Sequence, residues 1–154
     1  MPAQPLPTRQ PKPKVFVDAD VLFAGSAAPS EQGASLVLLR MAEITLLEAY
    51  ASQQVVAEVE RNLLAKLPKA LPAMHMILSR CLKIVPDPQP DELIPYAGLA
   101  EATDLSILVA ALRTGCPWLV SFNLRHYQPG HPAVTVLPPG DFLLRVRERL
   151  ARMG

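Results

Sequence analysis

The sequence predicts an α/β fold in which helices cover both faces of a parallel β-sheet. The first observation is the apolar run Val15-Phe16-Val17, which follows a proline-rich segment and is typical of a strand buried on both faces. The second is that short apolar runs alternate with segments of helical periodicity. The third is that half of the 154 residues are hydrophobic while the formal net charge is only +1. One domain with a sizeable core is therefore expected.

Composition narrows the functional classes. The balanced charge offers no general attraction to nucleic acid, so any basic patch must be local. Cys81 and Cys116 lack metal-type spacing and are expected to be reduced thiols. No apolar run is long enough to cross a bilayer, and the N-terminus lacks the apolar core of a signal peptide. We therefore expect a cytoplasmic protein without a membrane partner.

Residues 1–13 carry five prolines among polar and basic residues and are predicted to be a flexible tail. Residues 14–154 are predicted to form the folded domain. Its first strand covers 15–17, and the small residues that follow predict a loop over 24–32.

The middle of the chain continues the alternation. The almost wholly apolar segment 33–42 predicts a helix that is buried or lies in a subunit contact. The apolar run 44–51 predicts the second strand, and Ser52 begins a helix that ends near Leu67, before a proline. A third helix is expected over 70–80.

The remaining elements follow the same reasoning. Residues 82–85 form a short apolar strand, and the proline-rich stretch 86–95 is expected to contain turns. A strong apolar stripe predicts a helix over 99–114, and 118–121 forms the fourth strand. The last strand and the last helix are expected at 134–137 and 141–152.

Polar side chains collect where the predicted strands end and helices begin. Taken alone, Asp18 is explained as a helix cap, and Glu58 as a solvated residue at the border of an apolar face. The helix dipole alone could favour Glu101 and Asp104 at a helix start. The full set is Asp18, Asp20, Glu58, Glu101, Asp104, Ser121 and Asn123.

Taken together, these side chains indicate metal chemistry. Oxygen ligands without thiolates suit hard cations such as Mg²⁺ or Mn²⁺. A divalent cation at such a site lowers the pKa of a bound water and stabilises charge on a phosphodiester. Without the cation the acids would repel a polyanion, so we expect strict metal dependence.

Four motifs in order resemble the PIN-domain nucleases, including the VapC-type toxins of bacterial toxin–antitoxin pairs. The motifs are VFVDADVL, SQQVVAEVERNL, TDLSILVAAL and LVSFNLRHY, and the resemblance runs from about residue 14 to residue 142. It implies a three-layer α/β/α fold with a five-stranded parallel sheet of order 3-2-1-4-5. In that order the first and fourth strands flank the crevice where ligands bind.

The resemblance also implies the roles of individual residues. Matched by position, Asp18, Glu58 and Asp104 would bind Mg²⁺ or Mn²⁺ and act in catalysis together with Asn123. Asn123 stands where many members have a fourth aspartate, so it keeps an oxygen but loses a charge. This departure puts a second metal in doubt.

Further residues complete the predicted site. The resemblance implies that Asp20 and Ser121 support the ligands, and Glu101 is a possible extra acid without a firm counterpart. Arg125 and His126 are candidates for phosphate contacts.

The predicted function is that of a metal-dependent endoribonuclease that leaves 5′-phosphate and 3′-hydroxyl ends. The family suggests a homodimer with RNA as substrate and, if the protein is a toxin, an antitoxin that blocks the groove. One alternative is a PIN scaffold that binds RNA or a protein partner but cleaves poorly, because Asn123 lacks the charge.

A second alternative is a phosphatase of the haloacid dehalogenase type. VFVDADVL also resembles the Asp-x-Asp strand of that family, and LVSFN resembles its second motif. That chemistry needs a downstream lysine and a further acidic pair. Lys83 is the last lysine of the chain, and only Asp141 and Glu148 are acidic beyond Ser121.

Overall fold

The structure is a computed structural model that describes residues 12–27 and 33–153. Its strands are β1 (Lys14–Val17), β2 (Glu48–Ser52), β3 (Leu82–Val85), β4 (Trp118–Val120) and β5 (Thr135–Leu137). All pair in parallel, in the order β3-β2-β1-β4-β5. The predicted strand order is confirmed. Most of the predicted N-terminal tail lies outside the described residues.

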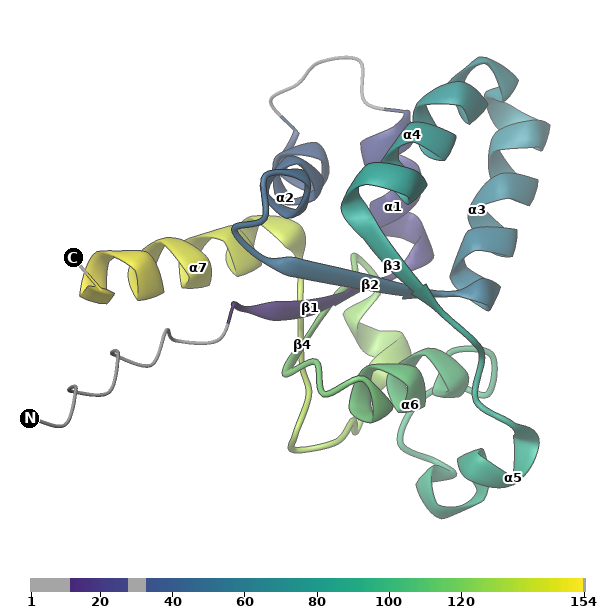
Figure 1. Ribbon diagram of the computed structural model, residues 1–154. Helices are drawn as coiled ribbons and strands as arrows, with labels where there is room; N and C mark the ends of the chain where they lie inside the picture. The colour runs from purple at the N-terminus through teal and green to yellow at the C-terminus, as the bar shows by residue number, and fades with distance from the viewer. Residues whose placement is uncertain (1–11, 28–32, 154) are drawn as a thin grey trace, which may run out of the picture.

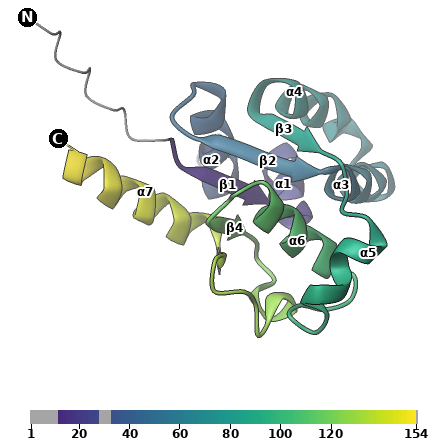
Figure 2. The same cartoon turned by 60° about the horizontal axis from the view of Figure 1, so that its bottom comes forward.

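Helices cover both faces of the sheet, as predicted. The helices are α1 (Ala19–Ser26), α2 (Ala34–Glu43), α3 (Gln53–Lys66), α4 (Leu71–Cys81), α5 (Pro90–Leu93), α6 (Leu105–Arg113) and α7 (Pro139–Met153). Figure 1 shows α1 to α4 on one face and α5 and α6 on the other. Figure 2 shows α7 extending from the side of the sheet that carries β4. In the described part of the chain, no helix has both the length and the apolar character needed to cross a membrane.

The central strand β1 is completely enclosed. Val15, Phe16 and Val17 expose none of their surface, because a strand between two helical layers has no solvent side. Each such side chain stabilises the fold by roughly 1.5–3 kcal/mol relative to an exposed position. The run of consecutive apolar residues in the sequence therefore indicates a strand that is buried on both faces.

The chain leaves β1 toward β2 on one side, while β4 lies on the other side. This makes the carboxyl ends of β1 and β4 the switch point of the sheet, where crevices form. The pairing continues past the strands, because the backbone N–H of Asp18 donates to the carbonyl of Val120 at 3.0 Å. Ser121 N–H likewise donates to the carbonyl of Leu137 at 3.1 Å. These hydrogen bonds fix Asp18 and Ser121 at the same edge of the sheet, where β1 and β4 end.

The loop predicted over 24–32 is wrong in its first part, because α1 continues to Ser26. Asp18 caps this helix by accepting a hydrogen bond from Ala19 N–H. The small residues of α1 let the helix pack closely against α2. A Cβ on Gly25 would lie 2.5 Å from Leu39 Cδ1, so glycine permits the close approach of α1 and α2. Residues 28–32 lie outside the described residues.

The strand predicted over 44–51 is also too long at its start. Residues 44–46 form an exposed turn, in which Thr45 has a φ of +64°. The N–H groups of Thr45 and Leu46 donate to the last carbonyls of α2. The apolar residues at 44 and 46 therefore close a helix instead of beginning β2.

The helix predicted over 99–114 begins only at Leu105. The residues before it are held as a loop, because Glu101 N–H donates to the carbonyl of His126 at 2.7 Å. Gly130 N–H donates to the carbonyl of Leu99 at 2.8 Å. This correction places Asp104 at the N-cap of α6, with its backbone fixed by the neighbouring loop.

Candidate metal centre

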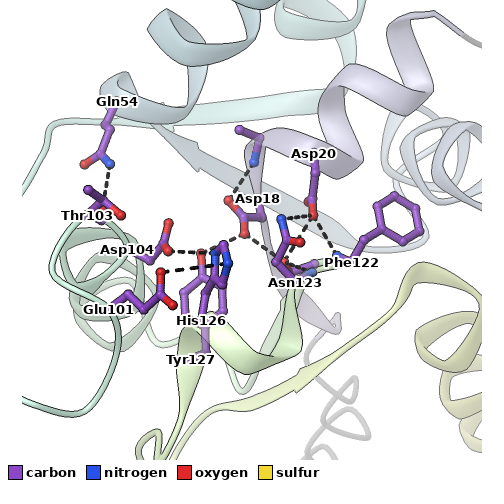
Figure 3. Close-up of polar contacts among 12 residues, drawn as sticks. Asp18, Asp20, Gln54, Glu101, Thr103, Asp104, Phe122, Asn123, His126 and Tyr127 are labelled. Carbon is purple, nitrogen blue, oxygen red and sulfur yellow. Dashed lines mark hydrogen bonds and ion pairs between the residues drawn. The ribbon is translucent and has the colours of Figure 1, made fainter.

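Asp18 is the most tightly held side chain of the site. It is only 6% exposed, and its Oδ1 accepts from Ala19 N–H at 2.7 Å. Its Oδ2 accepts from the hydroxyl of Ser121 at 2.8 Å and from the hydroxyl of Tyr127 at 2.7 Å (Figure 3). Because a carboxylate oxygen has two lone pairs, only Oδ1 keeps room for a further ligand.

Asp20 lies beside Asp18 in the first turn of α1. Its Oδ2 accepts from Phe122 N–H at 2.9 Å and from Asn123 Nδ2 at 3.1 Å. Its Oδ1 is buried and has no hydrogen-bond partner. Burial, with a smaller contribution from the charge of Asp18, raises the pKa of Asp20 to about 6.

Ser121 joins the two aspartates. Its side chain is fully buried, and its Oγ lies 2.8 Å from Asp18 Oδ2 and 3.4 Å from Asp20 Oδ2. A hydroxyl has one proton to donate, and the shorter distance favours Asp18. The same Oγ accepts from Asn123 N–H at 3.0 Å, which fixes the backbone after β4.

Glu58 on α3 and Asp104 at the N-cap of α6 both lie within electrostatic range of Asp18. Burial raises the pKa of Glu58, and the charges of Asp18 and Asp104 raise it further. Burial also raises the pKa of Asp104, with Asp18 as the next cause. These carboxylates therefore lie within electrostatic range of one another although they are far apart in the sequence.

The donor set fits a hard divalent cation. Such ions prefer carboxylate oxygens, and here several carboxylates gather at one edge of the sheet. Their raised pKa values show that each charge lacks a cationic neighbour strong enough to compensate for burial. The unpartnered Oδ1 of Asp20 is a further oxygen available to an ion.

His126 lies against two acids. Its Nδ1 is 3.1 Å from Asp104 Oδ2, and its Nε2 is 3.8 Å from Glu101 Oε2 (Figure 3). One ligand atom from each of these three residues lies within 4.8 Å of the others, so the group could hold a metal ion. Among the described residues, Asp18, Asp20 and Glu58 are not part of a group with this spacing. The predicted contact of His126 with phosphate remains a prediction, and the exposed Arg125 precedes it on the same turn.

Tyr127 is a residue of the site that the sequence did not reveal. It is 3% exposed and ends the short 3₁₀ helix Leu124–Tyr127. Burial, then the charge of Asp18, raises the pKa of its hydroxyl, so the hydroxyl keeps its proton and donates to Asp18. The only sequence signal is an aromatic residue four positions after Asn123.

Gln54 is a second such residue. Its Nε2 donates to the carbonyl of Thr103 at 2.8 Å, and its Oε1 accepts from the hydroxyl of Ser106. Its backbone N–H donates to Asp87 Oδ1 at 2.9 Å. Gln54 therefore ties the first turn of α3, which leads to Glu58, to the loop that carries Asp104.

Comparisons with known proteins agree with this architecture. Residues 14–125 match the PIN domain family. VapBC2 from Rickettsia felis, solved bound to a DNA fragment from its promoter, has a TM-score of 0.58 and 16% identity over 80% of this chain and 96% of that chain.

A second solved structure is VapC20 from Mycobacterium tuberculosis, described as a sarcin-ricin loop cleaving toxin. It has a TM-score of 0.50 and 16% identity over 70% of this chain and 88% of that chain. At this identity the two structures show a shared fold. No curated protein matches the chain.

Proposed function

Because the chain belongs to the PIN-domain family, we propose that it is a divalent-metal-dependent endoribonuclease. The support for this proposal is that Asp18, Glu58 and Asp104 lie within electrostatic range of one another. The charge of Asp18 raises the pKa of both other carboxyl groups. Acids that are buried or half-buried and repel one another add nothing to the stability of a core, but they suit a cation.

The proposed centre assigns a task to each neighbouring residue. Asp18, Glu58 and Asp104 would hold Mg²⁺ or Mn²⁺. The ion would supply charge stabilisation at the phosphodiester and activation of water. Ser121 and Tyr127 fix the orientation of Asp18 through hydrogen bonds to its Oδ2. The exposed Arg125 would contact a phosphate of the RNA.

We also propose the toxin role of a toxin–antitoxin pair, with an antitoxin as protein partner and a homodimer as the assembled state. Support comes from the likeness of the fold to VapBC2 and to VapC20, the latter being described as a toxin that cleaves the sarcin-ricin loop. Co-purification of the chain with the product of the adjacent reading frame would test this role.

The nuclease assignment is tested with end-labelled RNA in the presence of Mg²⁺ or Mn²⁺. We expect cleavage to 5′-phosphate ends, loss of cleavage in EDTA, and loss in Asp18→Asn. Glu43→Gln is the matched control, because Glu43 is exposed at the end of α2, and it should cleave like the wild type.

Three results would contradict the assignment. Equal cleavage by Asp18→Asn would mean that the activity belongs to a contaminant. Hydrolysis of p-nitrophenyl phosphate without RNA cleavage would indicate the phosphatase alternative. RNA binding without cleavage by the wild type would indicate the scaffold alternative, which the amide at Asn123 motivates.

A further inference from the structure

We propose that Asp20 is a direct ligand of the divalent cation through its Oδ1, and that Asn123 orients Asp20 for this purpose. The inference rests on the proposed function. It reverses the predicted roles, in which Asp20 supports the site and Asn123 completes it.

The hydrogen bonds of Asp20 are divided unequally between its two oxygens. Oδ2 accepts from Phe122 N–H at 2.9 Å and from Asn123 Nδ2 at 3.1 Å, with Ser121 Oγ at 3.4 Å. Oδ1 is buried without a partner. Buried carboxylate oxygens are normally hydrogen-bonded or bound to a metal. The carboxylate is thus held by one oxygen while the other stays available.

Asp20 also lies beside Asp18. The Oγ of Ser121 lies within 3.4 Å of an oxygen of each carboxylate, so the two groups are neighbours. Asp18 in turn acts electrostatically on Glu58 and Asp104. A cation placed among these three acids would therefore also meet the charge of Asp20.

The contacts of Asp20 leave its charge uncompensated. Its polar neighbours are the backbone N–H groups of Phe122 and Val21, the amide of Asn123 and the hydroxyl of Ser121, all of them neutral. Figure 3 shows Asn123 beside Asp20, and its Nδ2 faces the carboxylate. A carboxylate at residue 123 would repel Asp20, whereas the amide holds it in place. The amide and the nearby acid therefore form one functional pair.

The test is the Mn²⁺ affinity of the full chain, measured by isothermal titration calorimetry without RNA. Asp20→Asn keeps the shape and the acceptor oxygen for Phe122 and Asn123 but removes the charge. We expect Kd for Mn²⁺ to rise at least about tenfold. Unchanged affinity would overturn the inference, because loss of a direct ligand must raise Kd.

A charge-swap variant separates ligation from a structural effect. Asp20→Asn combined with Asn123→Asp returns one carboxylate to the pair but not at the position of Asp20 Oδ1, so the Mn²⁺ affinity should stay as low as in Asp20→Asn. Wild-type affinity in the double variant would overturn the inference, because the charge alone would then be sufficient. If Asp20→Asn does not fold, Asn123→Ala provides the measurement, because this side chain is exposed. It should weaken Mn²⁺ binding, and wild-type affinity would contradict the proposed orienting role.

Asp18→Asn distinguishes this inference from the proposed function. Wild-type Mn²⁺ affinity in Asp18→Asn would contradict the metal centre as a whole. Loss of affinity in Asp18→Asn with none in Asp20→Asn would contradict only the role of Asp20. Glu43→Gln, which changes an exposed acid, controls for non-specific loss of charge.

Discussion

At the residue scale, the hydrogen bonds of Asp18 decide how the site can be used. The hydroxyls of Ser121 and Tyr127 donate hydrogen bonds to its Oδ2, and the N–H of Ala19 donates one to its Oδ1. An ion can therefore approach Asp18 through a single oxygen. The two hydroxyls fix the direction of that oxygen before any ion arrives.

Tyr127→Phe should destabilise the protein by about 1–3 kcal/mol, because it removes a hydrogen bond to a buried carboxylate. Urea denaturation in EDTA would measure this change. Tyr50→Phe is the matched control, since the hydroxyl of Tyr50 also donates to a carboxylate, that of Glu48, at 3.1 Å. That pair is only partly buried, so its loss should cost less. Equal costs for the two variants would contradict the special position of Tyr127.

Asn123→Asp should lower the melting temperature in EDTA and increase the stabilisation produced by Mn²⁺. The reason is that the new carboxylate would stand where the amide nitrogen now lies 3.1 Å from Asp20 Oδ2. Like charges at that distance repel until a cation lies between them. Differential scanning fluorimetry with and without Mn²⁺ would measure both effects. A higher melting temperature in EDTA would contradict the prediction.

Site residues that directly follow a strand could be predicted from the sequence. Site residues whose only role is a hydrogen bond to a distant part of the chain could not. Asp18 and Asp20 stand out because acids directly after a buried strand are costly unless they have a task. Tyr127 and Gln54 carry no such signal. From the sequence, Tyr127 cannot be distinguished from an ordinary core residue. Only the structure shows that its hydroxyl donates a hydrogen bond to Asp18.

At the scale of elements, the link between α3 and the start of α6 sets the separation of Glu58 and Asp104. Gln54 supplies this link through the carbonyl of Thr103 and the hydroxyl of Ser106. The ends of elements are also where sequence prediction failed. The apolar pattern of 99–104 suits a helix, but hydrogen bonds to distant segments hold it as a loop.

Gln54→Ala should loosen the loop before α6 and weaken Mn²⁺ binding, because Asp104 would lose its fixed distance from α3. Hydrogen exchange of the backbone amides of residues 101–105 should become faster than in the wild type. Gln53→Ala is the matched control, since Gln53 is exposed at the start of the same helix. Unchanged exchange in Gln54→Ala would show that the loop is held by its other contacts.

At the scale of the whole molecule, the acids of the site couple stability to pH. The pKa of Asp20 is raised to about 6, and those of Glu58 and Asp104 are also raised. The folded state then binds protons more tightly than the unfolded state. The metal-free protein should therefore be more stable below the unfolded pKa of Asp20 and lose stability as pH rises through about 6.

The shift of Asp20 would correspond to about 3 kcal/mol for a fully buried group. Because Asp20 is only half-buried, solvent screening reduces the expected loss to the order of 2 kcal/mol. Urea denaturation in EDTA at a series of pH values would measure it. Asp20→Asn should flatten this part of the pH dependence, and an identical slope in that variant would contradict the assignment. Added Mn²⁺ should stabilise the protein most at neutral pH, where the carboxylates are ionised.

The sequence predicted the overall architecture better than it predicted where individual helices begin and end. The apolar runs located all five strands described in the structure, and the fully buried β1 explains why its signal was strong. Periodicity alone cannot order strands, so the order 3-2-1-4-5 depended on the family resemblance. The start of α6 could not be located from local sequence, because the loop before it is held by hydrogen bonds to distant backbone.

The parallel direction of every strand has a practical consequence. β1 runs from Lys14 toward Asp18, so its amino end lies on the far rim of the sheet from the acids. An affinity handle or a surface linker joined ahead of Lys14 would meet the domain at that rim. Immobilised protein should then leave the acidic edge facing bulk solution, open to long polymers.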